Sequence, residues 1–373
     1  SVRKQQIKAR ELFALFMKER ANTGRIYLQN VDHCNTHGAF DPSQAPIKQS
    51  NLCMEITLPT KPLYSVQDNS GEVALCTLSA VNLGALDSLD ELEGITDIIV
   101  RSLDSLLDYQ DYPLKSAEIT SNNRRTLGIG VTNLAYYLAK NDAKYSDGSG
   151  NDLIHKTFEA LQYYSLKASN EIAQEFGPCP LFSETQYAKG IMPIDSYKKD
   201  IDDFCNTKLE LDWDALRTNI KEKGLRNSTL TALMPCESSS QISNSTNGIE
   251  PPRGFISVKQ SKDGILKQVV PEYEKLHKKY ELLWDIKDNE GYLQLCAIMQ
   301  KFVDQSISTN THYDPSQYDG NRVPMKLFLM DLLKAYKYGI KTLYYHTTRD
   351  GASDDQNLEQ KGDDDCEDGV CKL

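Results

Sequence analysis

TLGIGVTNLAYYLAK, residues 126–140, is the stretch that decides the fold class of this chain. Its first half, residues 126–131, is apolar, contains β-branched residues and predicts a strand. Its second half, residues 133–140, predicts a helix that follows the strand directly. Gly128 and Gly130 favour tight packing against a neighbouring strand. They do not complete a dinucleotide-binding motif, because position 133 is Asn.

The same alternation of strand and helix extends in both directions from this stretch. It predicts an α/β fold with parallel strands. A long helix is expected at about residues 152–176, because Gly177 and Pro178 would end it. The other expected strands are residues 25–30, 51–57, 72–78, 230–234, 254–258 and 266–270. The other expected helices are residues 91–106, 272–285, 290–303 and 323–336.

Composition sets broad limits on the class of protein. The chain has 373 residues and a formal net charge of -11. It is long enough for two or three domains, and its acidic balance disfavours binding to nucleic acid. No run of apolar residues is long enough to predict a membrane span. Nine scattered cysteines favour a reducing cytoplasm, or a host cytoplasm for a viral protein. The chain begins with Ser1 and enters a helical pattern almost at once, which suggests a piece of a larger or split protein.

Residues 51–57 carry the most suggestive chemistry. In an extended segment, side chains alternate between two faces, so Asn51, Cys53 and Glu55 are expected to share one face. An amide, a thiol and a carboxylate form a set suited to chemistry on a polyol. The alternative stays open, because any half-buried strand alternates in this way and a single cysteine is usually a small core residue.

Three further groups of residues have both a functional and a structural interpretation. Glu237, Ser238 and Ser239 follow a predicted strand and open a helix, so they form a phosphate cradle or an ordinary helix cap. Tyr344 and Tyr345 are core or interface aromatics, or they relay a radical. The remaining candidates are the possible zinc ligands His33, Cys34 and His37, for which no metal is predicted.

Two cysteines lie in an acidic C-terminal tail that begins near Gly351 and is expected to be disordered. Cys366 and Cys371 have no other cysteine or histidine nearby in the tail, which argues against zinc and favours dithiol–disulfide exchange. A flexible linker of about 20 residues reaches roughly 25 Å. Such a tail can enter a site and leave it again.

Taken together, these features resemble the catalytic large subunit of class I ribonucleoside-diphosphate reductase, over its C-terminal half. The resemblance covers the whole chain and rests on the order and spacing of several short motifs. These are residues 50–56 (SNLCMEI), 74–78 (ALCTL), 124–131 (RRTLGIGV), 224–229 (GLRNST), 234–239 (MPCESS), Tyr344-Tyr345, and the Cys366 and Cys371 tail.

The resemblance implies a particular fold. It implies the C-terminal half of a ten-stranded α/β barrel, in which a central finger loop carries the catalytic cysteine. Three parts are then expected. Residues 1–253 would form the half-barrel with its finger loop, residues 254–345 a small α/β appendage with a docking helix at 323–336, and residues 346–373 a flexible redox tail.

The resemblance also implies roles for residues at the matching positions. Cys53 would become a thiyl radical that takes the 3′ hydrogen of the ribose. Glu55 would act as general base on the 3′ hydroxyl, and Asn51 would hold the ribose hydroxyls. Cys76 would be one of two reducing thiols. The other implied roles are radical transfer by Tyr344 and Tyr345, binding of the substrate diphosphate by Glu237, Ser238 and Ser239, and re-reduction of the site by Cys366 and Cys371.

The implied partners follow from the same family. They are an N-terminal half of the large subunit, a diiron small subunit that supplies the radical, thioredoxin or glutaredoxin, and ribonucleoside diphosphates. No cofactor is expected on this chain, and ATP or deoxynucleotide effectors would bind the N-terminal half. Cys236 departs from the family, where a serine is frequent. Two alternatives remain, namely a cobalamin-dependent reductase and a catalytically silent scaffold for the small subunit.

Overall fold

The computed structural model describes residues 4–261, 264–349, 366–367 and 370–371. It confirms the strand and helix predicted from residues 126–140. Strand β3 (Leu127–Thr132) is buried along its whole length and leads into helix α5 (Leu134–Lys140). β3 pairs in parallel with β2 (Thr77–Asn82), with Thr77 opposite Leu127. The α/β class with parallel strands is therefore confirmed.

The parallel arrangement continues beyond β3. Bridges join Ile129 to Thr231 and Leu233 to Ile307, so residues 229–234 and then 305–309 lie next in the row. The second segment runs on into β6 (Thr311–Tyr313), which pairs in parallel with β8 (His346–Thr348). At the far edge, β7 (Thr342–Leu343) pairs antiparallel with β1 (Leu28–Gln29).

This row stays open. Within the ranges that the structure describes, no strand pairing joins β1 to β2 and closes a barrel. The predicted strand at 230–234 is an extended, buried segment held by single bridges rather than by a ladder. The prediction of parallel strands is correct, and the closed ten-stranded barrel remains an expectation from the family.

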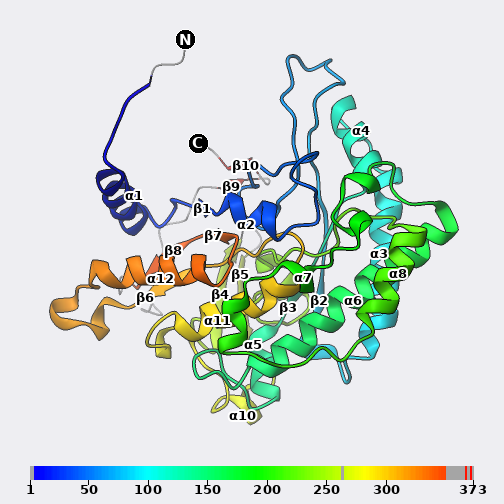
Figure 1. Ribbon diagram of the computed structural model, residues 1–373. Helices are drawn as coiled ribbons and strands as arrows, with labels where there is room; N and C mark the ends of the chain where they lie inside the picture. Colours follow the sequence, from blue (N-terminus) through cyan, green and yellow to red (C-terminus); the bar gives the residue numbers. More distant parts are fainter. Residues whose placement is uncertain (1–3, 262–263, 350–365, 368–369, 372–373) are drawn as a thin grey trace.

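The longer helices lie on two sides of these strands (Figure 1). Helices α3 (Glu91–Tyr109), α6 (Asn151–Phe176) and α8 (Trp213–Lys223) gather on one side. Helices α1 (Ala9–Thr23) and α12 (Met325–Lys337) lie on the other. α6 ends at Gly177, whose φ of 84° suits glycine, as expected from the sequence. No helix in the described part of the chain is long and apolar enough to cross a membrane.

The remaining elements are short, apart from helix α11 (Glu290–Phe302), which is buried along most of its length. The short α-helices are α2 (Val31–Thr36), α4 (Lys115–Arg124), α7 (Pro193–Ser196), α9 (Glu237–Ile242) and α10 (Tyr273–Leu276). The 3-10 helices are Leu83–Ala85, Phe182–Glu184, Tyr187–Lys189, Lys199–Asp203, Leu283–Asp285, Pro315–Gln317 and Asp319–Asn321.

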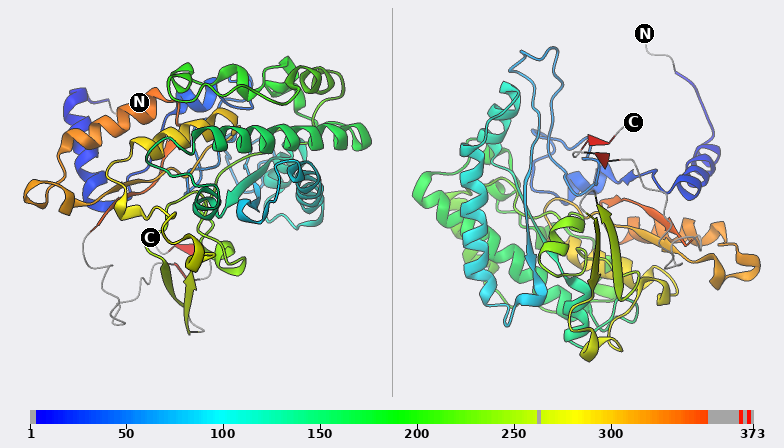
Figure 2. Two further views of the ribbon diagram at one scale, coloured as in Figure 1. Left: turned by 90° about the horizontal axis from the view of Figure 1, so that it is seen from below. Right: turned by 180° about the vertical axis from the view of Figure 1, so that it is seen from behind.

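The region after residue 254 only partly follows the prediction. Strands β4 (Ile256–Ser261) and β5 (Gly264–Val269) form an antiparallel hairpin that projects from the body (Figure 2). The predicted helix at 272–285 is wrong, because only α10 and one 3-10 turn form there. A hydrogen bond of 2.8 Å from the Leu283 amide to the Pro252 carbonyl draws the chain away from a helical path.

One hydrophobic core spans both sides of the predicted boundary at residue 254. It contains Leu127 and Ile129 of β3 together with Ile298 of α11 and Leu343 of β7. The division into a half-barrel, an appendage and a tail stays a prediction about folding units.

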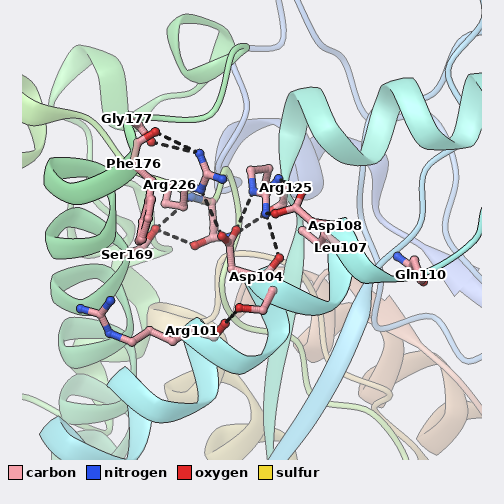
Figure 3. Close-up of polar contacts among 12 residues, drawn as sticks. Arg101, Asp104, Leu107, Asp108, Gln110, Arg125, Ser169, Phe176, Gly177 and Arg226 are labelled. Carbon is pink, nitrogen blue, oxygen red and sulfur yellow. Dashed lines mark hydrogen bonds and ion pairs between the residues drawn. The ribbon is translucent and has the colours of Figure 1, made fainter.

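A buried polar network fastens α3 to the strands (Figure 3). The Asp104 carboxylate accepts hydrogen bonds from Arg125 Nε at 2.6 Å, Arg226 Nε at 3.1 Å and Asn227 Nδ2 at 2.9 Å. Asn227 also accepts a hydrogen bond from the Ser169 hydroxyl on α6. Two of the sequence motifs, 124–131 and 224–229, therefore meet at one carboxylate.

Candidate functional site

The loop that carries Cys53 is not the predicted strand. Residues 52–54 form a turn, and Met54 has a left-handed φ of 70°. The Asn51 side chain and backbone cause this turn, because the Asn51 carbonyl accepts from the Met54 amide and Asn51 Oδ1 accepts from the Ile56 amide. Leu52 is exposed rather than an anchor in the core. The predicted strand at residues 51–57 is therefore wrong, although Asn51 and Glu55 are hydrogen-bonded to each other and Ser308 binds both the Cys53 backbone and Glu55.

Glu55 is the buried carboxylate of this loop. Its Oε1 accepts a hydrogen bond from Asn51 Nδ2 at 2.9 Å, and its Oε2 accepts one from the Ser308 hydroxyl at 3.3 Å. Burial raises the pKa of Glu55, and the two hydrogen bonds oppose that rise. A carboxyl group with a raised pKa, held by two donors, is suited to accept a proton as general base.

Cys53 lies beside a cluster of tyrosines. The Tyr344 hydroxyl is 3.6 Å from Cys53 Sγ, and the Tyr344 and Tyr345 ring centroids are 4.1 Å apart. Tyr344 is buried, whereas Tyr345 is 36% exposed. The two rings thus lead from the protein surface to the thiol. Burial and the hydrogen bonds to Tyr345 and Cys53 raise the pKa of Tyr344, so its phenol keeps its proton.

A third ring completes this cluster and was missed by the sequence analysis. Tyr27 lies next to β1, and its ring centroid is 4.6 Å from that of Tyr344 and 5.3 Å from that of Tyr345. Burial and a hydrogen bond to Tyr345 raise the pKa of Tyr27. The residues around Tyr27 read as an ordinary strand, so only the fold reveals this contact.

Cys76 lies immediately before β2 and is half-buried. Gln305 Nε2 is 3.5 Å from its sulfur. Gly128 on the adjacent strand makes room for the thiol, because a Cβ at that position would lie 3.0 Å from Cys76 Sγ and 2.5 Å from a Leu78 methyl carbon. The predicted use of this glycine in tight packing is confirmed. Burial raises the pKa of Cys76 to about 12.

The predicted phosphate cradle lies at the start of α9. Glu237, Ser238 and Ser239 are all exposed there. The first intrahelical hydrogen bond of α9 runs from the Ser240 amide to the Cys236 carbonyl at 2.8 Å, so the backbone N–H groups of these three residues have no acceptor within the helix. Cys236 is buried, with its sulfur 3.7 Å from the Val131 carbonyl, and burial raises its pKa. The unusual thiol therefore lies between β3 and the cradle, where a hydrogen bond with the Ser239 side chain opposes the rise in its pKa.

The redox tail is described only in part. The backbones of β9 (Cys366–Glu367) and β10 (Val370–Cys371) pair antiparallel, with Cys371 opposite Cys366. The predicted disorder of the tail falls on residues 350–365, 368–369 and 372–373, which lie outside the described residues.

His33, Cys34 and His37 do not form a metal centre in the structure. Both ring nitrogens of His37 have hydrogen-bond partners, namely Ser196 Oγ at 2.8 Å and the Gln300 carbonyl at 2.7 Å. His33 Nδ1 lies 3.3 Å from the Ile340 carbonyl. Across the described ranges, no three histidine, cysteine or acidic side chains are grouped in a way that could hold a metal ion.

Residues 304–310, here called the central segment, touch each part of the site around Cys53, Glu55 and Tyr344. The Ser306 amide donates to the Glu55 carbonyl at 2.9 Å, and the Ser308 hydroxyl donates to the Cys53 carbonyl at 2.6 Å. The Thr309 carbonyl accepts from the Tyr344 amide at 2.7 Å. Its sequence, DQSISTN, is polar although the segment is buried. The sequence analysis therefore found no strand here.

The central segment also connects Tyr345 to a titratable group. Asn310 Oδ1 accepts from the Tyr345 amide at 2.9 Å, and Asn310 Nδ2 donates to the Glu250 carboxyl group. Burial and the nearby Glu237 raise the pKa of Glu250 to about 7, while Arg253 and Asn310 oppose the rise. Glu250 is therefore protonated in the folded state at pH values where an exposed glutamate is ionised.

Glu250 should make the stability of the chain depend on pH. Because its folded pKa is raised from 4.5 to about 7, its contribution is fully present below pH 4.5 and is lost as pH rises through 7. Glu250→Gln should remove this loss of about 1–3 kcal/mol. Urea unfolding of both proteins between pH 4.5 and 8 measures the difference. Parallel pH profiles for the two proteins would contradict the prediction.

Comparisons with known proteins agree with the motifs and the fold. Residues 1–346 match the family model described as "Ribonucleotide reductase, barrel domain". The chain is 65% identical over 373 residues to the ribonucleoside-diphosphate reductase subunit alpha of Haemophilus influenzae, and 66% identical over 375 residues to subunit alpha of reductase 1 of Escherichia coli. It is 50% identical over 378 residues to the subunit alpha of Enterobacteria phage T4.

Each of these three matches covers the whole chain but only 49% of the relative. The chain thus spans about half the length of the curated relatives it matches. The chain belongs to the ribonucleotide reductase family and corresponds to the C-terminal barrel region of a class I alpha subunit.

Proposed function

We propose that the chain is the catalytic half of a ribonucleoside-diphosphate reductase large subunit, and that it acts together with an N-terminal half. The observation that carries the proposal is the position of the Cys53 loop. Its thiol lies 3.6 Å from the Tyr344 hydroxyl, and the Ser308 hydroxyl binds both the Cys53 carbonyl and the Glu55 carboxylate. A thiol in contact with a tyrosine, on a loop that also carries a buried carboxylate, suits radical chemistry on a ribose.

The proposed reaction gives a role to each of these groups. Tyr345 and Tyr344 pass the radical to Cys53, which takes the 3′ hydrogen atom of the ribose. Glu55 accepts the proton of the 3′ hydroxyl while Asn51 holds the ribose hydroxyls. The 2′ hydroxyl leaves as water. Cys76 and a cysteine of the N-terminal half supply two electrons and two protons and become a disulfide. Glu55 gives its proton back to the 3′ oxygen, Cys53 returns the 3′ hydrogen atom, and the radical passes back to Tyr344.

Binding and re-reduction are assigned to the surface groups. We expect the N–H groups at the start of α9 and the side chains of Ser238 and Ser239 to bind the substrate diphosphate, with Glu237 beside them. Cys366 and Cys371 would reduce the active-site disulfide by thiol–disulfide exchange and would then be reduced by thioredoxin or glutaredoxin. The opposed backbones of β9 and β10 bring the two positions close together, as this step requires.

The small subunit would deliver the radical near Tyr345. Helix α12 presents Met325, Met330 and Leu333 as exposed apolar side chains. Arg20 of α1 donates to the Tyr344 carbonyl at 2.8 Å, so α1 also lies at this end of the tyrosine cluster. An apolar helix face beside the exposed tyrosine suits a docking site for a subunit that must hand over a radical.

The N-terminal half would cover the open edge of the strand row. β2 is only partly buried, whereas β3 beside it is fully buried. Leu75 and Leu78 are 39% and 40% exposed at this edge. An uncovered edge with apolar side chains favours pairing with another polypeptide.

Reconstitution tests the proposal. The chain alone, with small subunit, effector and dithiol, should form no deoxyribonucleoside diphosphate, because the partner of Cys76 is absent. Adding a polypeptide that corresponds to the N-terminal half of the relatives should restore product, measured by chromatography. Product from the chain alone, or none from the assembled proteins, would reject the proposed division of the enzyme.

Removal of the Tyr344 hydroxyl separates the proposed function from a cobalamin-dependent reductase. In the assembled protein, Tyr344→Phe should lower turnover at least about a hundredfold, because phenylalanine cannot pass a hydrogen atom to Cys53 Sγ. Tyr163→Phe, which removes a hydroxyl on α6, is the control and should leave turnover unchanged. Unchanged turnover in Tyr344→Phe would favour the cobalamin-dependent class.

A further inference from the structure

The side-chain amide of Gln305 is fully buried and has four polar neighbours. Its Nε2 is 2.9 Å from the Leu127 carbonyl, 3.3 Å from the Thr229 hydroxyl and 3.5 Å from Cys76 Sγ. Its Oε1 accepts from the Thr57 amide at 3.3 Å. These neighbours fix the orientation of the amide, because the Thr57 N–H can only donate and the Leu127 carbonyl can only accept.

The Gln305 side chain has fewer N–H hydrogens than there are acceptors around it. Nε2 carries two hydrogens, and three acceptors surround it. The Leu127 carbonyl, at the shortest distance, takes one hydrogen. The Thr229 hydroxyl and the Cys76 sulfur share the other.

The backbone of Gln305 is as firmly held as its side chain. Its amide donates to the Thr231 carbonyl at 3.1 Å, and its carbonyl accepts from Gln300 Nε2 at 3.1 Å and from the buried Lys341 ammonium group. Because its backbone and side chain are both held, Gln305 Nε2 has a fixed position. The Cys76 sulfur can keep its hydrogen bond to Nε2 only if it stays beside that position.

We propose that Gln305 is the positioning residue of Cys76, whose amide holds the thiol on the central segment and links it through Thr57 to the loop of Cys53 and Glu55. The inference rests on the proposed function, in which Cys76 is a reducing thiol. Within that function, Gln305 fixes where one reducing sulfur lies relative to the loop that activates the ribose.

The same contact acts on the chemistry of the thiol. Burial, together with the carboxylates of Glu55 and Asp304, raises the pKa of Cys76 to about 12. The hydrogen bond from Gln305 opposes this rise, because an N–H donor stabilises the thiolate. The thiolate is the form that attacks and leaves during disulfide exchange.

Alkylation of Cys76 in the intact chain tests the proposal. Iodoacetamide forms a carbon–sulfur bond with the thiolate, iodide leaves, and the thiol proton goes to solvent. Gln305→Met keeps the length of the side chain and removes both donors. Cys76 should then react about threefold more slowly at a fixed, mildly alkaline pH, because a lower thiolate fraction is partly offset by higher nucleophilicity. Peptide mass spectrometry measures the rate at each cysteine.

Two controls separate this effect from a loosened fold. Gln294 on α11 is another glutamine, half-buried, whose Nε2 donates to Glu290 Oε1 at 2.9 Å, and within the part of the chain that the structure describes no hydrogen bond joins it to Cys76. Gln294→Met makes the same change of side chain and should leave the Cys76 rate at the wild-type value. A loosened fold would increase the alkylation rates of Cys76 and of the buried Cys179 and Cys296. The proposal predicts the opposite, a lower rate at Cys76.

A second variant predicts the opposite change. Thr229→Val removes the competing acceptor, so the second N–H of Gln305 passes fully to Cys76, and the thiol should react about twofold faster. An unchanged or faster Cys76 rate in Gln305→Met, with Cys179 and Cys296 still protected, would overturn the proposal. If Gln305→Met exposes Cys179 and Cys296, the alkylation rate of Cys76 in Thr229→Val becomes the test. An unchanged Cys76 rate in Thr229→Val would then overturn the proposal.

These rates need no turnover, so the two proposals can fail separately. A correct response of Cys76 in assembled proteins that form no product would reject the proposed function and leave the role of Gln305. If the assembled proteins form product but the alkylation rate of Cys76 is unchanged by both substitutions, the role of Gln305 is rejected and the proposed function stands.

Discussion

The Cys53→Ser chain, assembled with an N-terminal polypeptide and a small subunit, should form deoxyribonucleoside diphosphate at least about a thousandfold more slowly than the wild-type assembly. A serine O–H bond is much stronger than a thiol S–H bond. A radical on Tyr344, 3.6 Å from the sulfur, therefore cannot pass to the serine oxygen. Chromatographic measurement of product from a nucleoside diphosphate gives the ratio of rates.

A matched substitution elsewhere in the chain supplies the control. Cys205 is a buried thiol, whereas Cys53 is half-buried; its sulfur is 3.8 Å from the Asn151 carbonyl, and it has no part in the proposed site. Cys205→Ser makes the same change of atom and should keep most of the activity. Equal activity of the two serine variants would remove Cys53 from the mechanism.

Loss of the Asp104 carboxylate should produce the largest change in stability. Asp104→Ala leaves Arg125 buried with its remaining partner Asp108, and leaves Arg226 and Asn227 without the carboxylate that they share (Figure 3). Breaking a buried ion pair by removing one partner destabilises a protein by about 3–5 kcal/mol. Urea unfolding followed by circular dichroism measures the change in the free energy of unfolding.

The same helix offers the control for this prediction. Asp97 forms an ion pair of 2.8 Å with Arg101 one turn along α3, and both side chains are more than a third exposed. Exposed pairs of this kind contribute about 0.3–0.5 kcal/mol. A loss in Asp104→Ala no larger than that in Asp97→Ala would show that the network in Figure 3 does not hold α3 to the strands.

Regular elements could be predicted from the sequence where the determinants are local. The bounds of β3 and α6 follow from apolar periodicity and from Gly177. The predicted packing role of Gly128 is explained by contacts with the neighbouring strand, where a Cβ would lie 2.5 Å from Leu78. The apolar pattern and Gly177 lie within the element or beside it, whereas for Gly128 the residue type alone indicates a close neighbour and the fold supplies Leu78.

The parts that failed depend on distant contacts. The loop at residues 51–57 turns because Asn51 binds its own backbone, and it is then held by Ser306 and Ser308, about 250 positions later. No pattern near Asn51 contains that information. The residue types of the site were still predicted, since the identities of Cys53 and Glu55 do not depend on the backbone that presents them.

The central segment was missed for a different reason. Sequence patterns identify buried strands by apolar residues, and DQSISTN has only Ile307. Its polar side chains can be buried because they bind other polar groups. Ser308 binds Glu55, Asn310 binds the Tyr345 amide and Gln305 binds Cys76. In the sequence, such a segment is visible only as a run of polar residues that follows the apolar end of the helix predicted at 290–303.

One length of backbone, the central segment, carries the contacts to Cys76, Glu55, Cys53 and the tyrosine pair. The number of residues in the central segment therefore sets the distances between these groups. Insertion of a single residue between Gln305 and Ser308 would reverse the faces of everything that follows. Gln305 would keep Cys76, while Ser308 and Asn310 would turn away from Glu55 and Tyr345. A change in the length of this segment would therefore separate the proposed reducing thiol from the proposed path of the radical.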